Sequence, residues 1–285
     1  MLAEQVAMDA DSGVDDISSW PPERIGSRTM RQRWSELAFL HWAFPPEAVQ
    51  PLLPDELRVD LFDGAAWVGI VPFRLEISLA RLPFVPWVSR FAEVNVRTYV
   101  VGPDGRRGIW FLSLDAARLG AALVARKTYR IPYVWSRTKV HRDGTTVRYE
   151  TERRWPRGHG AALAAQVEPN SFVPPDACSP LERFVTCRWR LYSPAPLKLP
   201  ASHIRLFATQ VEHTPWPLWR ARCRGLRETL LQAAGLDRPD RPALAHFSPG
   251  VDVWFGARAI ASHVLGEQRG PRVEPSGQFG LTSTT

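Results

Sequence analysis

The sequence contains few lysines, few cysteines and no long hydrophobic run. Lys127, Lys139 and Lys198 are its lysines, so arginine supplies almost all of the positive charge behind the net charge of +7. The three cysteines form no Cys-x-x-Cys pair, which indicates reduced thiols rather than a metal site or a disulfide framework. No apolar stretch approaches the roughly 20 residues of a membrane span, and the acidic N-terminus lacks the features of a secretory signal. We therefore expect a cytoplasmic protein with no bound metal and no membrane partner.

A basic chain can bind nucleic acid, but the arginines here are scattered and acidic residues lie between them. The sequence has no helix-turn-helix, zinc-finger or RNA-binding signature. Its densest basic run, residues 220–227, fits the solvated face of a helix. A phosphate-binding G-x-x-x-x-G-K-S/T loop is also absent, and the glycines between 102 and 108 fit a hairpin turn. We expect no nucleic-acid partner and no cofactor.

Proline and aromatic residues predict many short strands and tight turns. The chain has 26 Pro and 12 Trp; proline interrupts strands, and tryptophan supplies large buried surface. Turn sequences at 63–64, 103–105 and 143–144 predict three hairpins. Asp115 is expected to cap the helix that follows it. The other predicted elements are strands at 34–44, 183–193, 204–216 and 251–255, helices at 45–54, 116–129 and 217–236, and a connector at 156–180.

These elements indicate an α+β fold that is mainly β, with an antiparallel, hairpin-built sheet and few helices. Neither half of the chain makes an obviously complete sheet alone, so we favour a single domain at 25–266. Residues 1–24 are acidic and aperiodic, and residues 267–285 have a similar polar character. Both ends are therefore expected to be disordered tails.

The stretch FAEVNVRTYV, residues 91–100, raises the main question about function. Glu93, Asn95 and Arg97 occupy every second position, and alternate side chains of a strand point to the same face. On a surface strand this row faces water, whereas on the wall of a barrel it faces a pocket. A buried glutamate and arginine must pair or bind something, because a lone buried charge is very costly.

Several stretches, taken in their order and spacing, resemble the DUF2071 family, which is also called YqjF-like. The resemblance covers roughly residues 30–255. That family is related in fold to acetoacetate decarboxylase, so the resemblance implies a curved, largely antiparallel sheet closed into a cone-like barrel with a central cavity. The matching stretches are HW (41–42), PPEAVQPLLPDELRVDLFDGAAWVGIVPF (45–73), FAEVNVRTYV (91–100), GIWFLSLDA (108–116), AR (125–126) with IPY (131–133), and, more weakly, RFVTCRWRLYS (183–193) and VEHTPWPL (211–218).

The chemistry of the decarboxylase is not implied by this resemblance. It needs a lysine that forms a Schiff base and a second, adjacent lysine that lowers the pKa of the first amine. Tyr133 follows Pro132 where that lysine would stand, and the chain contains no Lys-Lys pair. Lys127 and Lys139 each lie six residues away from Tyr133. We expect no step that depends on a lysine.

The resemblance does imply a set of cavity residues. Glu93 matches an acidic position of the decarboxylase family, and Arg97 would project from the same face. We predict catalytic roles for Glu93, His41 and Tyr133, and substrate-binding roles for Arg97, Asn95 and Arg126. Each also has a structural interpretation: an ion pair or solvated face for the strand residues, a hydrogen-bonded core histidine, a packed tyrosine and a structural arginine. Weaker candidates in the second half are Arg188, Tyr192 and His213.

The sequence therefore predicts a protein that binds a small anionic organic molecule, a keto or carboxylic acid, in a barrel cavity. Lyase, hydratase or isomerase chemistry without a Schiff-base lysine is one outcome of such binding. Two alternatives stay open: a ligand-binding or sensory module without catalysis, and an interaction protein that docks through tryptophans. An exposed strand edge and many aromatic residues are compatible with a homodimer.

Overall fold

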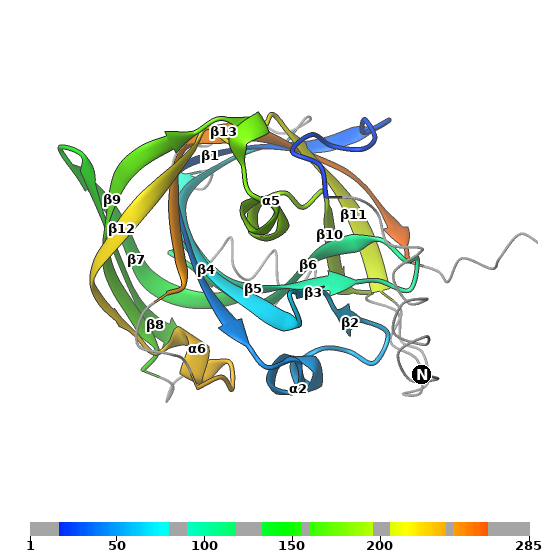
Figure 1. Ribbon diagram of the computed structural model, residues 1–285, viewed down its shortest axis with the longest axis horizontal. Coiled ribbons are helices and arrows are strands. Elements are labelled where there is room, and N and C mark those ends of the chain that lie inside the picture. The colour runs from blue at the N-terminus through cyan, green and yellow to red at the C-terminus, as the bar shows by residue number, and fades with distance from the viewer. Residues whose placement is uncertain are drawn as a thin grey trace, which may run out of the picture.

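The computed structural model describes residues 17–79, 90–117, 133–155, 160–195, 206–237 and 242–261, and most of them are in strands (Figure 1). The strands are β1 (Arg28–Phe44), β2 (Arg58–Val59), β3 (Leu61–Phe62), β4 (Ala65–Leu79), β5 (Arg90–Val101), β6 (Arg107–Ala116), β7 (Tyr133–Asp143), β8 (Thr146–Trp155), β9 (Ala162–Val173), β10 (Arg190–Pro194), β11 (Leu206–His213), β12 (Leu218–Glu228) and β13 (Leu244–Ile260). The helices are α2 (Pro46–Val49), α5 (Pro180–Thr186) and α6 (Leu230–Ala233), with 3-10 turns η1 (Gln50–Leu52) and η2 (Pro175–Ala177). None of these helices is long and apolar enough to cross a bilayer.

One sheet contains all thirteen strands of the described residues. Its order is β11-β10-β6-β7-β8-β9-β12-β13-β1-β4-β5-β2, and β3 pairs with β4. Additional pairings of β11 with β13 and of β5 with β6 close the sheet on itself. A first ring runs through β13, β1, β4, β5, β6, β10 and β11; a second ring leaves β6 through β7, β8, β9 and β12 and returns to β13 (Figure 1). The strands β13, β1, β4, β5 and β6 form a wall common to both rings, which confirms the predicted curved and mainly antiparallel sheet.

Side chains on the two faces of this common wall enter two different cores. On β1, Leu37 and Phe39 pack in one core, whereas Ala38 and Leu40 pack in the other. This follows from the alternation of side chains along a strand. Strands that are covered on both faces read as nearly continuous apolar runs, which explains the dense hydrophobic content of residues 34–44.

Helix α5 lies inside the first ring (Figure 1). Ser179 and Glu182 form a capping box, in which the Ser179 hydroxyl accepts a bond from the Glu182 N–H at 3.2 Å and Glu182 accepts one from the Ser179 N–H at 2.9 Å. The prediction of a strand at 183–193 was wrong for residues 183–186. Phe184 and Val185 favoured a strand, but the capping box starts a helix.

The predicted hairpins are confirmed. Asp63 and Gly64, which join β3 to β4, have positive φ angles of 50° and 73°. Gly105 and Gly144, with φ of 72° and 58°, turn the chain between β5 and β6 and between β7 and β8. The helical turn after residue 45 is also confirmed, with Pro46 in its first turn.

Three other predictions were wrong. Residues 218–228 form strand β12 instead of a helix, with exposed arginines alternating with half-buried residues. The period of two was the correct signal, and pairing with β9 and β13 outweighs the helix propensity of arginine and leucine. The connector at 156–180 contains β9, which pairs with β8 and β12. Asp115 is not a helix cap, because it lies within β6.

The two ends of the chain and the predicted helix at 116–129 are only partly described. Residues 17–24, which we assigned to a tail, contact segments next to the sheet: the Ser19 hydroxyl donates to the Pro175 carbonyl at 3.2 Å, and the Trp189 indole N–H donates to the Ser18 carbonyl at 3.1 Å. Residues 1–16 and 267–285 lie outside the described residues, as do residues 118–129 of the predicted helix.

Candidate functional site

The first ring encloses a cavity of about 550 Å³. All seven of its strands contribute side chains, and the end of α5 contributes Thr186. A cavity of this size lies within the range of small-molecule sites, about 300–1,000 Å³. The polar or charged lining residues that bear on the argument are Glu93, Asn95, Arg97, Thr186, Arg188, Ser193, Thr209 and His213.

The polar row of β5 faces this cavity. Glu93, Asn95 and Arg97 all line it, with exposed fractions of only 3%, 5% and 6%. The apolar neighbours Val94 and Val96 point the other way, into the core of the second ring. Four residues along a strand span roughly 13 Å at about 3.3 Å each. Glu93 and Arg97 therefore lie at opposite ends of the row.

Arg97 is a buried cation with little compensation. Its hydrogen bond among the described residues runs from Nη2 to the Val185 carbonyl oxygen, 3.2 Å away. Its guanidinium carbon lies 5.6 Å from the ring centre of Phe39 and 5.7 Å from that of Tyr99. Among the described residues, no carboxylate oxygen lies within 4.0 Å of the Arg97 guanidinium nitrogens, and the buried Nε has no hydrogen-bond partner. A buried guanidinium without a counter-ion indicates a binding site for an anion.

The end of α5 offers Arg97 only a partial counter-charge. Val185 lies in the last turn of α5, where carbonyl groups carry the negative end of the helix dipole, about half a charge in a long helix. The Tyr99 hydroxyl donates a short hydrogen bond to the same carbonyl, and the Trp216 indole N–H donates to the Thr186 carbonyl at 3.0 Å. These bonds hold the helix end in place and leave most of the Arg97 charge unbalanced.

Arg188 is the second buried guanidinium of the cavity, and it has a counter-ion. Its Nη2 lies 2.9 Å from Asp60 Oδ2, while Arg107 Nη1 lies 2.7 Å from Asp60 Oδ1. Burial lowers the pKa of Arg188 to about 10, and the Asp60 charge opposes this. The side chain remains protonated at neutral pH, and Asp60 fixes its position.

His41 is not a lining residue of the cavity. It is fully buried on β1, and its Nε2 lies 2.7 Å from the Tyr99 hydroxyl. Because that hydroxyl gives its proton to Val185, His41 Nε2 must be the donor in this bond. Burial, and then the charge of Arg97, hold the pKa of His41 well below its ordinary value. His41 is therefore a neutral support for Tyr99.

His213 lies in the cavity wall, between two indole rings. The centroid distances are 4.5 Å to Trp189 and 4.4 Å to Trp216. Its Nδ1 lies 2.6 Å from the Thr214 carbonyl oxygen, so Nδ1 carries the proton and Nε2 has the lone pair. Burial lowers the pKa of His213 to about 4, with Arg97 adding to this and the bond to Thr214 opposing it. The ring is a neutral hydrogen-bond acceptor at pH 7.

The remaining predicted site residues are placed only in part. Tyr133 begins β7, and its backbone pairs with Leu114, which lines the cavity; its side chain lies outside what the structure describes. Arg126 lies outside the described residues. Their roles stay predictions.

Asp115 belongs to a buried cluster away from the cavity lining. Its two oxygens accept bonds from Arg153, Nε at 2.7 Å and Nη2 at 2.9 Å, and the same Nη2 also donates to Ser113 at 2.7 Å. Burial raises the pKa of Asp115, and Arg153 opposes this. None of these three residues is in the cavity lining, so this ion pair joins β6 to β8 and has a structural role.

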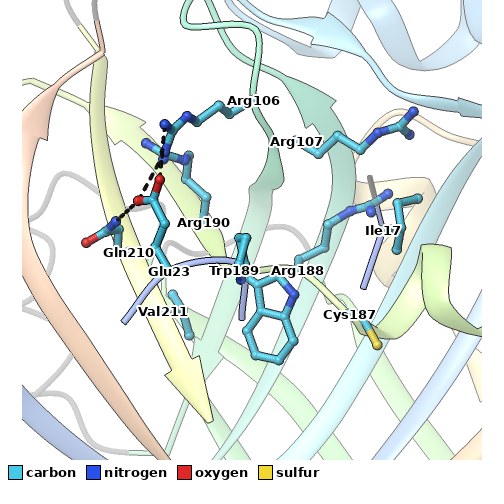
Figure 2. Close-up of a pocket in the computed structure, with 11 residues that line it drawn as sticks. Ile17, Glu23, Arg106, Arg107, Cys187, Arg188, Trp189, Arg190, Gln210 and Val211 are labelled. Carbon is cyan, nitrogen blue, oxygen red and sulfur yellow. Dashed lines mark hydrogen bonds and ion pairs between the residues drawn. The ribbon is translucent and has the colours of Figure 1, made fainter. Parts of the chain in front are cut away.

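A second pocket, of about 40 Å³, adjoins the cavity through Arg188 and Val211, which line both (Figure 2). Several guanidinium groups surround it, but they are already paired. Arg106 lies 3.4 Å from Glu23, and Arg190 lies 3.1 Å from Asp104. Figure 2 shows Glu23 reaching from the N-terminal segment toward Arg106 and Gln210. The pocket holds little more than water, and its ion pairs fasten that segment to the sheet.

Comparison with known sequences identifies the family. A profile of DUF2071, described as an uncharacterized conserved protein, matches residues 31–252. The chain belongs to the DUF2071 family. It is also similar to uncharacterized protein YqjF of Bacillus subtilis (strain 168), with 33% identity over 227 residues, which are 79% of this chain and 90% of that protein.

Solved structures with a similar fold include acetoacetate decarboxylase-like enzymes. The enduracididine biosynthesis enzyme MppR, complexed with pyruvate, has a TM-score of 0.59 at 12% identity, over 85% of this chain and 93% of that one. Acetoacetate decarboxylase from Legionella pneumophila subsp. pneumophila str. Philadelphia 1 has a TM-score of 0.59 at 13% identity, over 85% and 91%. An acetoacetate decarboxylase-like enzyme from Sphingomonas wittichii RW1 has a TM-score of 0.56 at 11% identity, over 82% and 93%. At these identities the likeness shows the fold.

Proposed function

We propose that this DUF2071 protein binds a small organic carboxylate, such as a keto or carboxylic acid, in the cavity of the first ring. The observation that carries the proposal is Arg97, a buried guanidinium that lines the cavity and has no carboxylate within 4.0 Å among the described residues. A planar carboxylate can accept two parallel hydrogen bonds from such a group. The pyruvate complex of MppR, a protein of the same fold, supports a ligand of this class.

The neighbouring groups suit recognition of such a ligand. Asn95, one pleat from Arg97, has a buried carbonyl oxygen without a partner among the described residues. A polar group left in this state is uncommon and needs an explanation, which a bound ligand or ordered water supplies. Arg188 and the neutral His213 add a donor and an acceptor to the wall. Arg126 remains a further proposed binding residue.

For catalysis, Glu93 is the proposed acid or base, since it is the one carboxylate among the described lining residues. Tyr133 is the proposed hydrogen-bond donor to a ligand oxygen. His41 is not retained as a base, because it is buried behind Tyr99 with a lowered pKa. Lys139, the lysine of the described residues, is exposed on β7. Because the chain has no Lys-Lys pair, proton transfer in a lyase, hydratase or isomerase reaction is proposed, without a Schiff base.

The alternative is a cytoplasmic ligand-binding or sensory module that performs no reaction. It is favoured by the low pKa of His213 and the burial of His41, which leave few acid–base groups at the cavity. Turnover separates the two functions. Bound acids would be incubated with the wild-type protein and with Glu93→Gln, and followed by proton NMR for conversion or for exchange of carbon-bound protons in D₂O. Glu93-dependent conversion supports the enzyme, whereas binding without either change supports the module.

Binding is tested by calorimetry with a panel of short keto and carboxylic acids. We expect at least one acid to bind, and Arg97→Gln to weaken it about 10- to 100-fold, as expected for loss of a charged hydrogen bond. The matched control is Arg33→Gln, an exposed arginine of β1 outside the lining. If no acid binds, or if both variants bind equally well, the carboxylate site is wrong.

A further inference from the structure

The cavity offers far more apolar surface than a short keto acid requires. Apart from its polar groups, it is lined by aromatic and aliphatic side chains from β1, β4, β6, β11 and β13. Its volume of about 550 Å³ falls in the range of sites that hold drug-sized molecules. The apolar lining residues that carry the argument are Trp34, Phe73, Ile77, Trp216 and Phe255.

Trp34 is the centre of an aromatic wall within this lining. Its ring centroid lies 5.5 Å from that of Phe73, 6.2 Å from that of Phe255 and 6.2 Å from the stacked ring of Trp216. The indole N–H groups are already used: Trp34 donates to Gln32 at 2.6 Å, and Trp216 donates to the Thr186 carbonyl at 3.0 Å. The rings therefore present carbon surface to the cavity.

Phe39, a buried residue outside the lining, connects this aromatic wall to the cationic site. It lies 5.6 Å from the Arg97 guanidinium, and its ring makes a T-shaped contact with that of Trp216, with the centroids 5.2 Å apart. Trp216 in turn stacks on Trp34. In the other direction, the lining continues along β4 from Phe73 to Ile77. These four steps along the strand add roughly 13 Å, at about 3.3 Å per residue. A ligand anchored at Arg97 thus has aromatic and aliphatic surface leading away from its charged end, beside Glu93, whose backbone pairs with Phe73.

We propose that the ligand of this cavity is an amphipathic monocarboxylate, with its carboxylate on Arg97 and a long aliphatic or aromatic group along the Trp34 wall. This inference rests on the proposed function, since it uses the same arginine. One carboxylate suffices, because Arg188 already shares Asp60 with Arg107. The lining side chains of β4, from Phe73 to Ile77, are apolar and favour a hydrocarbon tail.

The test is calorimetric titration with straight-chain acids from acetate to dodecanoate, beside the primary alcohols of the same length. Transfer of a methylene from water should raise the affinity about fourfold per carbon until the cavity is full. Arg97→Gln should weaken every acid by a similar factor and leave the alcohols unchanged. The length series in the wild-type protein needs no variant, and it decides by itself whether the cavity takes a long tail.

Two matched variants locate the tail. Trp34→Leu should weaken the long acids and leave the short ones unchanged, whereas Trp20→Leu should change neither, since Trp20 is 61% exposed and outside the lining. If short acids bind through Arg97 but affinity does not rise with length, the amphipathic ligand is refuted and the proposed function stands. If long acids bind Arg97→Gln as tightly as the wild type, the carboxylate site itself is refuted.

Discussion

Replacing Arg97 by methionine should leave the folded protein at least as stable while removing carboxylate binding. Methionine keeps an unbranched, apolar side chain that can pack against Phe39 and Tyr99, and it removes the charge. A residue kept only for folding would show the opposite result, since its loss would lower the free energy of unfolding. The prediction therefore separates a functional cation from a structural one.

The expected magnitude follows from the contacts of Arg97. The variant loses one charged hydrogen bond to Val185, about 1.5–3 kcal/mol. It also loses two cation–π contacts which, at 5.6 and 5.7 Å, are near the distance limit of such contacts and are taken at about 0.5–1 kcal/mol each. It gains relief from the burial of an ion, which costs several kcal/mol when no counter-charge repays it. The difference should fall between zero and about 2 kcal/mol in favour of the variant.

Arg188→Met is the matched control. It removes a buried arginine of the same cavity, but this one has Asp60 at 2.9 Å. Breaking such a pair costs about 3–5 kcal/mol, and we expect the lower end because Arg107 still contacts Asp60. Urea denaturation at pH 7, followed by circular dichroism, measures both free energies of unfolding. If the free energy of unfolding of Arg97→Met is lower than that of the wild type by about 2 kcal/mol, Arg97 holds α5 in place, and its assignment as an anion-binding residue is refuted.

Further predictions concern the supports of the site. Gly69→Ala would place a Cβ 2.6 Å from Nε2 of His41, so thermal melts should show a loss of about 1–3 kcal/mol that His41→Ala in the same chain partly restores. His213, with a pKa of about 4 when folded, takes up a proton more readily when unfolded. The free energy of unfolding should therefore fall between pH 6.5 and 4, and it should fall less in His213→Gln. Equal losses of unfolding free energy in the two proteins between pH 7 and pH 4.5 would contradict this. Asp115→Asn should cost about 3 kcal/mol in urea, because Arg153 stays buried without a carboxylate, and no change would rule out a structural ion pair.

The parts of the fold that could be predicted from the sequence are those fixed by local signals. The hairpins at Asp63-Gly64 and at residues 103–105 and 143–144 depend on turn residues that determine backbone geometry by themselves. The burial of Glu93 and Arg97 on one face follows from the period of two, once the strand is known to line a barrel. That last condition came from the resemblance to a family and not from the strand itself.

The parts that could not be predicted depend on contacts between distant segments. Strand β12 has the residues of an amphipathic helix, and its pairing with β9 and β13 decides the outcome. Arg188 was a weaker candidate within a predicted strand at 183–193. In the structure residues 187–189 lie in no regular element, and the closure of the first ring brings Arg188 to the cavity. Asp60 gave no signal at all, since its role depends on Arg107 and Arg188, which are distant in sequence.

The common wall explains why the polar row of β5 is informative. A strand covered on both faces has no solvated side, so every charged group on it must find a partner in the protein or a ligand. The length of the polar row on β5 also links the two candidate functions to ligand size. Glu93 and Arg97 are separated by roughly 13 Å along the strand, so a short keto acid held by Arg97 would not reach Glu93. A long acid would. Chemistry at Glu93 therefore requires an extended ligand, and a protein that binds only short acids should bind them without turnover.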